Sequence, residues 1–111
     1  MRIAILISGG GSNMAALVDA MQSGAIKANP VLVLCNNSNA SGIDRAAERG
    51  IRTVVVDHRP HGEDRAAFDA ELQRALLAHK VDAVCLAGFM RVLTTPFVEF
   101  WAGRMLNIHP S

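Results

Sequence analysis

The sequence has little cysteine, no tyrosine and almost no excess of either charge. Its 111 residues contain two cysteines and carry a formal net charge of +1. Two cysteines are too few for the disulfide framework of a small secreted domain. Cys35 and Cys85 each lie within an apolar run, which favours two buried, reduced thiols. The near-neutral charge, with its lysines and arginines scattered, argues against nucleic acid or an acidic membrane surface as a partner.

A long apolar run is also missing. No stretch approaches the length that crosses a bilayer. The apolar start, from Met1 to Ile7, breaks at once into glycines and is too short for the apolar region of a signal peptide. We therefore expect a cytoplasmic protein with no membrane partner.

What the chain has in abundance is apolar residues, which make up half of it. This suits one small domain with a core of its own. Short β-rich runs alternate with helical patterns. The expected strands are Arg2–Ile7, Val31–Cys35, Thr53–Val56, Ala83–Ala87 and Met105–Ile108.

Helical spacing predicts the segments between these strands. One helix is expected over Asn13–Ser23, capped by Ser12 or Asn13. A second contains Ile43, Ala46 and Ala47 and stops at Gly50. The longest extends from about Asp64, its expected cap, to His79. A last, short helix ends at Gly103, with Thr95 as its cap and Pro96 at its first position.

The strands are continuous apolar runs, which is typical of a parallel sheet covered on both faces. We predict an α/β fold with a doubly wound, mainly parallel, Rossmann-like sheet in the order 3-2-1-4-5. The order reverses between strands 1 and 4, and ligands bind beside such a switch point. Three segments should meet there: Ser8–Asn13, Gly88–Leu93 and Asn107–Ser111.

The glycine-rich loop Ser8–Asn13 joins a strand to a helix. Glycine allows close approach to a ligand, and a helix start stabilises an anion. The loop is no dinucleotide fingerprint, because Met14 replaces the third glycine and no acid follows the second strand. A Walker lysine is absent. A phosphate monoester on a small sugar is the candidate ligand, and a tight turn without ligand is the alternative.

The loop after the fourth strand is unusually apolar. Met90, Arg91, Val92 and Leu93 suit a pocket for a flat, partly aromatic ligand. Phe89 is expected instead to pack under the following helix.

At the end of the chain, Asn107 and His109 should point in one direction, with Ile108 facing the core. An amide donor beside an imidazole suits oxyanion binding and proton transfer. We interpret the remaining histidines, His58, His61 and His79, as solvated. No spacing of ligand-type residues indicates a metal site.

The segments Ile7–Asn13, Ala87–Leu93 and Leu106–Ser111 together resemble phosphoribosylglycinamide formyltransferases, the folate-dependent glycinamide ribonucleotide transformylases of purine synthesis. The likeness covers the whole chain, with the three motifs in the right order and spacing. It implies a formyltransferase fold. It also implies transfer of a formyl group from 10-formyltetrahydrofolate, the co-substrate, to the amine of glycinamide ribonucleotide, with no metal.

The resemblance implies a role for each matching residue. Gly11, Ser12 and Asn13 would hold the phosphoribosyl group. Arg65 would contact the folate, whose pterin pocket Met90–Leu93 would line. Asn107 would bind the formyl oxygen, and His109 would act as the acid or as an imidazolium that stabilises the oxyanion.

Members of the resembled family are about twice as long, and their catalytic aspartate lies in the later half. We therefore expect residues 1–111 to be a single N-terminal, phosphate-binding part of a formyltransferase domain, truncated on its C-terminal side, in a monomer or homodimer. Two alternatives stay open: formyltetrahydrofolate deformylase and a catalytically silent phosphate-binding fragment. Methionyl-tRNA formyltransferase is disfavoured because the chain has no basic surface for tRNA.

Overall fold

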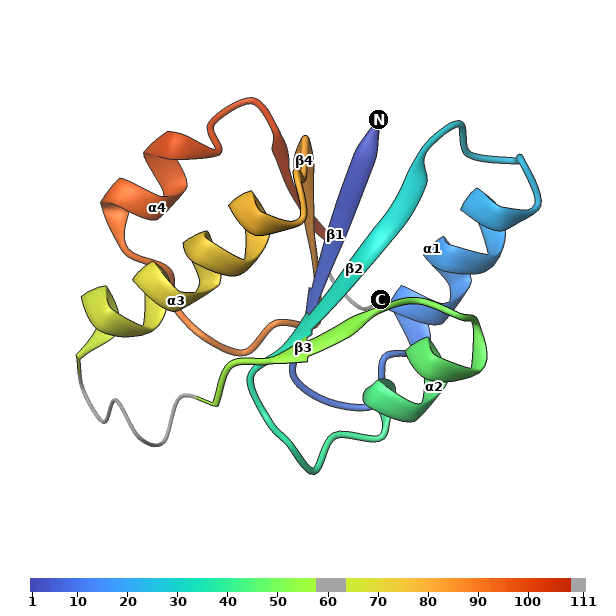
Figure 1. The fold of residues 1–111 in the computed structure, drawn as a ribbon, viewed down its shortest axis with the longest axis horizontal. Coiled ribbons are helices and arrows are strands. Elements are labelled where there is room, and N and C mark those ends of the chain that lie inside the picture. Colours follow the sequence, from blue (N-terminus) through green and yellow to red (C-terminus); the bar gives the residue numbers. More distant parts are fainter. Residues whose placement is uncertain (58–63, 109–111) are drawn as a thin grey trace.

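The described part of the chain forms a five-stranded parallel sheet with helices on both faces (Figure 1). A computed structural model describes residues 1–57 and 64–108. Its strands are β1 (Arg2–Ile7), β2 (Asn29–Cys35), β3 (Thr53–Val55), β4 (Ala83–Ala87) and β5 (Met105–Ile108). Its helices are α1 (Ser12–Gln22), α2 (Gly42–Glu48), α3 (Arg65–Ala78) and α4 (Thr95–Phe100). The strand order β3-β2-β1-β4-β5 confirms the predicted topology.

Two separate apolar cores explain why the strands are continuous apolar runs. Helices α1 and α2 cover one face of the sheet, and α3 and α4 cover the other (Figure 1). Successive residues of β1 alternate between the cores: Ile3, Ile5 and Ile7 pack with α1, whereas Ala4 and Leu6 pack with α3 and α4. The central residues of β1 and β2 are therefore buried whichever way they point.

The start of α1 differs from the prediction that Ser12 or Asn13 caps it. Gly11 occupies the cap position, in the left-handed conformation with φ 72°, and no side-chain cap bond forms. The first bond of the helix joins the Ala15 amide to the Gly11 carbonyl at 2.8 Å. The expectation was wrong because the loop must turn one residue earlier, where only glycine adopts this φ without strain.

The predicted cap residue is right for α3 and wrong for α4. Asp64 caps α3 as expected, its carboxylate accepting a 3.0 Å bond from the Ala67 amide. For α4 the cap is Thr94 rather than Thr95, and Pro96 moves to the second helical position. Thr94 takes the cap because both its amide and its hydroxyl donate to Asp69 of α3. That partner lies 25 residues away, beyond the reach of a local pattern.

The second strand is two residues longer than predicted and contains a proline. Pro30 pairs with Ile3, and the register shifts between Ile3 and Ala4. A proline lacks an amide donor, and such an irregularity is where a sheet accommodates one. At the far edge, β3 ends at Val55, one residue short of the prediction, although the Val56 amide still donates to Cys35.

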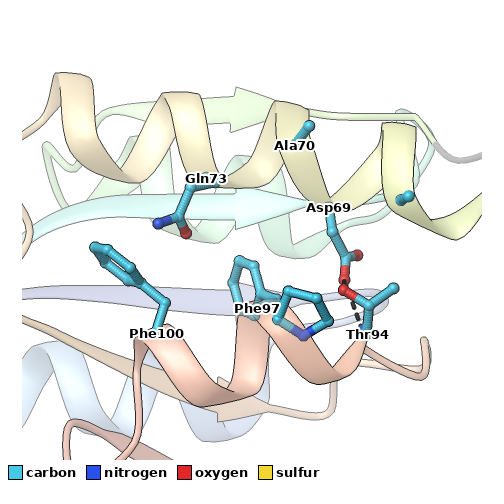
Figure 2. Close-up of a pocket in the computed structure, with 8 residues that line it drawn as sticks. Asp69, Ala70, Gln73, Thr94, Phe97 and Phe100 are labelled. Atoms are coloured by element: carbon cyan, nitrogen blue, oxygen red, sulfur yellow. Dashed lines mark hydrogen bonds between the residues drawn. The ribbon is translucent and has the colours of Figure 1, made fainter.

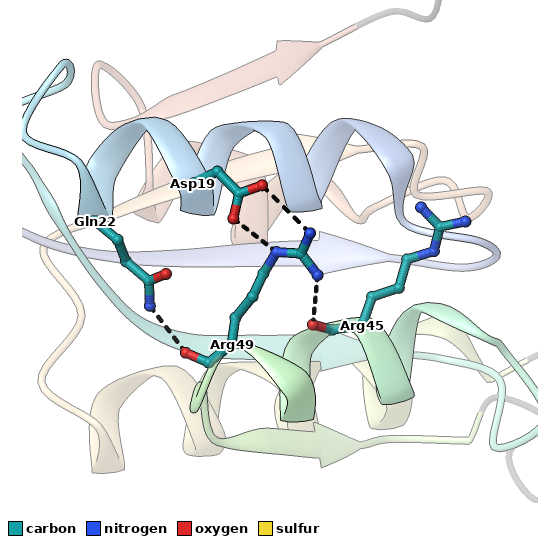
Figure 3. A network of polar contacts seen from close by, with 4 residues as sticks. All are labelled: Asp19, Gln22, Arg45 and Arg49. Atoms are coloured by element: carbon teal, nitrogen blue, oxygen red, sulfur yellow. Dashed lines mark hydrogen bonds and ion pairs between the residues drawn. The ribbon is translucent and has the colours of Figure 1, made fainter.

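A polar network joins α1 to α2 (Figure 3). The Arg49 guanidinium donates to both carboxylate oxygens of Asp19, at 2.8 and 3.3 Å, and to the Arg45 carbonyl at 3.0 Å. The Gln22 side chain donates to the Arg49 carbonyl. These bonds hold the two helices in a fixed relation, and the starts of both helices meet at the glycine loop. Within residues 1–57 and 64–108, no helix has the length and apolarity needed to cross a bilayer.

Candidate functional site

The ends of three strands lie in one row at the carboxyl edge of the sheet. Leu6 of β1 pairs with Leu86 of β4, and Leu86 pairs with Asn107 of β5. Neighbouring strands are about 4.8 Å apart, so Leu6 and Asn107 are separated by about 10 Å. The loop that follows β1 and the last residues of β5 therefore lie within the span of one small molecule, as the topology predicts.

The glycine loop after β1 packs against the start of α2. The Gly42 amide donates to the Gly9 carbonyl at 3.1 Å. A Cβ on Gly42 would lie 2.7 Å from that carbonyl, and one on Gly11 would lie 3.0 Å from the Gly42 Cα. The two segments thus meet backbone to backbone. A Cβ at Gly9 would meet nothing within 4 Å, so this part of the loop faces open space.

The start of α1 offers backbone donors beside this loop. Because the first helical bond begins at Ala15, the amides of residues 12–14 precede the hydrogen bonding of the helix. The cap residue is Gly11, which has no side chain to accept from them. Unused amides and the positive end of an eleven-residue helix stabilise an anion.

The loop after β4 is held at three points. The Met90 amide donates to the Ser8 hydroxyl at 2.8 Å. The Arg91 guanidinium lies over the Phe68 ring, 4.7 Å from its centroid. The Thr94 amide and hydroxyl donate to one carboxylate oxygen of Asp69 at 2.7 and 2.6 Å. The first anchor comes from the glycine loop and the other two from α3.

The residues predicted for the folate pocket differ in their exposure. The side chains of Met90 and Val92 are 83% and 66% exposed. Leu93 packs against the core beneath α3 and α4, as does Phe89, for which this was expected. Arg65 is exposed on the first turn of α3, one turn before Phe68. Exposed apolar side chains on an anchored loop form a surface ready for an apolar ligand.

Arg91 is the charged residue of the loop after β4. It is partly buried, and its Nε and Nη2 atoms are buried without a hydrogen-bond partner among the described residues. A guanidinium carries five donors, and buried donors without acceptors are costly. Stacking on Phe68 supports the plane of the group but accepts none of its in-plane hydrogens. A carbonyl or carboxylate oxygen would satisfy them.

Asn107 is exposed near the end of β5. It lies on the face of the sheet that α3 and α4 cover, since its neighbour Leu86 packs with them. Ile108, expected to face the core, is partly buried. The predicted histidine of the pair, His109, lies outside the described residues, as do His58 and His61.

His79, expected to be solvated, is bound at the end of α3. Its Nδ1 atom lies 2.8 Å from the Ala75 carbonyl and donates to it. His79 therefore helps to close α3 at its C-terminal end.

The described residues include two buried thiols. Cys35 and Cys85 are buried and unpaired, as predicted. Burial raises the pKa of both thiols. For Cys35 this outweighs the opposite effect of a hydrogen bond to the Asn37 carbonyl, which lowers the pKa. Both therefore stay protonated near neutral pH and are poor nucleophiles. Over the described residues, no three His, Cys, Asp or Glu side chains gather as a metal site would require.

A cavity of about 310 Å³ lies between α3 and α4 (Figure 2). Its lining is mainly apolar and includes Phe97 and Phe100, and none of the predicted site residues belongs to it. Thr94 and Asp69 form one end, where their hydrogen bonds link the cavity to the loop after β4. The cavity therefore borders the loop after β4 without containing a predicted site residue.

Sequence reasoning missed Ser8, Phe68 and Asp69, which fix the loop after β4. Ser8 was treated only as part of the glycine-rich loop, and Phe68 was given no role at the site. For Asp69 the sequence held a signal: it lies three and seven residues before the apolar Leu72 and Leu76, and in the structure it is 4% exposed. Buried carboxylates are nearly always paired, so its presence there indicated a partner outside the helix.

Comparisons with known proteins agree with the fold and identify the family. A family model described as formyl transferase matches residues 1–111. The chain is 51% identical over 112 residues to a trifunctional purine biosynthetic protein, adenosine-3, of Drosophila melanogaster, covering 99% of this chain and 8% of that protein. It is 43% identical to phosphoribosylglycinamide formyltransferase of Escherichia coli strain K12, covering 100% of this chain and 52% of that enzyme.

Solved structures show the same likeness. Glycinamide ribonucleotide transformylase 1 of Symbiobacterium toebii superposes with a TM-score of 0.92 at 39% identity, over 99% of this chain and 51% of that one. Phosphoribosylglycinamide formyltransferase of Brucella melitensis gives a TM-score of 0.92 at 41% identity, over 99% and 57%. The chain thus spans about half the length of these single-enzyme relatives. Because the family model matches all of residues 1–111 of this chain, the chain belongs to the formyl transferase family.

Proposed function

We propose that the chain contributes to a site that transfers a formyl group from 10-formyltetrahydrofolate to the amine of glycinamide ribonucleotide, in purine biosynthesis. Relatives from Drosophila melanogaster and Escherichia coli carry names for this activity or this pathway. We infer further that residues 1–111 are the N-terminal, phosphate-binding part of a larger formyltransferase domain. The half-length coverage of the single-enzyme relatives supports this division.

The phosphate of the amine substrate is assigned to the glycine loop. Gly11, Ser12 and Asn13 begin α1, where backbone amides precede the hydrogen bonding of the helix. A phosphate gains from these donors and from the helix dipole together. The left-handed Gly11 lets the chain turn so that the donors are not taken by a side-chain cap.

The folate is assigned to the loop after β4. Met90 and Val92 present exposed apolar side chains to a flat ring system, and Leu93 supports them from the core. Arg91 has buried donors that an oxygen of the ligand would satisfy. Arg65, exposed on the first turn of α3 and one turn before Phe68, would supply a second positive charge.

The chemistry is assigned to Asn107 and His109. Attack of the substrate amine on the formyl carbon gives a tetrahedral intermediate with a negative oxygen. The Asn107 amide would donate to that oxygen, a contribution worth about 3–4 kcal/mol by comparison with other acyl-transfer sites. A proton must leave the attacking nitrogen and reach the departing folate nitrogen. An imidazole is the side chain suited to such a transfer near neutral pH, and His109 is assigned this role.

The observation that carries the proposal is the row Leu6–Leu86–Asn107. It aligns the three strands whose ends bear the phosphate loop, the apolar loop and the amide donor. Without this register the three groups of residues would belong to separate surfaces.

The test is formyl transfer to glycinamide ribonucleotide, measured beside folate hydrolysis in the absence of an amine. The assay uses the purified chain and a polypeptide extended past Ser111. Asn107→Ala and His109→Ala should each lower kcat by orders of magnitude while circular dichroism stays that of the wild type.

Matched controls are Asn29→Ala and His79→Gln. Asn29 is exposed at the amino end of β2, at the opposite edge of the sheet, and His79 lies at the end of α3. Both should retain wild-type kcat. Near-normal turnover by either Asn107→Ala or His109→Ala would contradict the assignment, and hydrolysis without transfer would identify a deformylase.

A further inference from the structure

Ser8 makes a contact that its place in the glycine loop does not require. It follows β1 directly, and its hydroxyl accepts a 2.8 Å hydrogen bond from the Met90 amide, 82 residues later in the chain. A serine in a strand-to-helix turn ordinarily bonds to its own local backbone. Here the side chain instead joins the loop after β1 to the loop after β4.

This bond is different in kind from the other anchors of the loop after β4. The Phe68 stack and the Asp69 bonds both come from α3 and hold Arg91 and Thr94. They fix the later part of the loop against one helix. Within the part of the chain that the structure describes, the contact at Met90 ties the earlier part of the loop to the glycine loop.

The position of Met90 shows what this anchor achieves. Its backbone is bonded while its side chain is 83% exposed. A loop that presents apolar side chains to water tends to fold back onto the protein surface, because burial of apolar area is favourable. Fixing the amide keeps the backbone against the β1 loop and the side chain directed outward.

We infer that Ser8 is a positioning residue, which holds the loop containing Met90–Leu93 in the arrangement that binds the folate co-substrate, beside the loop that binds the phosphorylated one. This inference rests on the proposed function. Ser8 touches neither reacting atom in it. Its hydroxyl sets the distance between the two binding loops.

The test compares Ser8→Ala with Ser8→Thr, which keeps a hydroxyl at the same position. Ser23→Ala is the matched control, because the Ser23 hydroxyl donates to the Ala20 carbonyl within its own turn. The first measurement is hydrogen exchange of the Met90 amide by NMR, which needs no substrate. The second is steady-state formyl transfer in the purified, active protein.

Ser8→Ala should exchange the Met90 amide about two- to tenfold faster, the range that loss of one neutral hydrogen bond gives. The same variant should raise KM for 10-formyltetrahydrofolate by a similar factor and leave kcat within about twofold. Ser8→Thr and Ser23→Ala should match the wild type in both measurements. A residue that served stability alone would lower Tm without this change in KM.

Each contrary result has its own meaning. Unchanged exchange at Met90 in Ser8→Ala would overturn the inference, since the bond would not hold the loop. Faster exchange with unchanged KM would overturn the positioning role, as would a loss of kcat equal to the loss of kcat/KM. A wild-type protein that transfers no formyl group would instead overturn the proposed function, while the exchange rates would still decide whether Ser8 anchors the loop.

Discussion

At the scale of single residues, Arg91 combines stacking with unsatisfied donors. Its guanidinium rests on Phe68, and two of its buried nitrogens have no acceptor in the described part of the chain. Arg104 provides a comparison, because it stacks on Phe100 and Trp101 and also donates to the Phe100 carbonyl. Arg104 therefore has a hydrogen-bond acceptor within the protein, whereas two buried nitrogens of Arg91 have none among the described residues. The residue pattern Met90–Leu93 indicated a pocket but could not distinguish these two kinds of arginine.

The substitution Arg91→Lys tests this difference. Lysine keeps the charge but loses the planar fork and most of the stacking. We expect KM for the folate co-substrate to rise by about tenfold, as loss of one charged hydrogen bond would give, with kcat nearly unchanged. Steady-state kinetics with Arg104→Lys as the control measures the effect. Equal KM values for the two variants would show that Arg91 binds no ligand.

At the scale of elements, the strands were easier to predict than the helix ends. The bounds of β1, β4 and β5 agree with the prediction, because each is rich in apolar residues and lies between polar or small ones. The caps of α1 and α4 were wrong, since each depends on a distant segment. Gly11 turns where it meets Gly42, and Thr94 is selected by Asp69. Local preference ranks cap residues, and tertiary partners then choose between neighbours.

The adjacent threonines at the start of α4 provide a matched test. Thr94→Val removes a hydroxyl that donates to a buried carboxylate, whereas Thr95 is exposed. We expect Thr94→Val to lower the free energy of unfolding by about 1.5–3 kcal/mol, the range for hydrogen bonds to charged groups. Thr95→Val should stay within about 0.5 kcal/mol of the wild type. Urea denaturation followed by the fluorescence of buried Trp101 measures both, and similar values would contradict the assigned cap.

At the scale of the whole molecule, the candidate site is a product of topology. The predicted sheet order is confirmed, because it follows from patterns along the chain, whereas the roles of the glycine loop and Asn107 stay predictions. Sequence reasoning missed the contacts of Ser8, Phe68 and Asp69 with the loop after β4, since these join residues far apart in sequence. The roles of His109 and the extent of the domain stay predictions. A motif thus locates a site, while the contacts that shape it appear only in three dimensions.

The backbone contact between the glycine loop and α2 gives a prediction at this scale. Gly11→Ala places a Cβ at positive φ and 3.0 Å from Gly42, and Gly42→Ala places one 2.7 Å from the Gly9 carbonyl. Each should lower the free energy of unfolding by about 1–3 kcal/mol, as overpacking does. Gly9→Ala, where a Cβ meets nothing within 4 Å, is the control and should be nearly neutral. Thermal denaturation checks the order, which would fail if Gly9→Ala were the least stable.

The strand order also bears on how the chain is made. β1 precedes the other four described strands in the sequence and lies third in their order in the sheet. One of its edges is paired once β2 has followed, while the other stays open until Ala83–Ala87 has emerged from the ribosome. At about 5–20 residues per second this interval lasts on the order of seconds. An open apolar edge recruits other chains, so shielding of the nascent polypeptide is needed most between the completion of β2 and the arrival of β4.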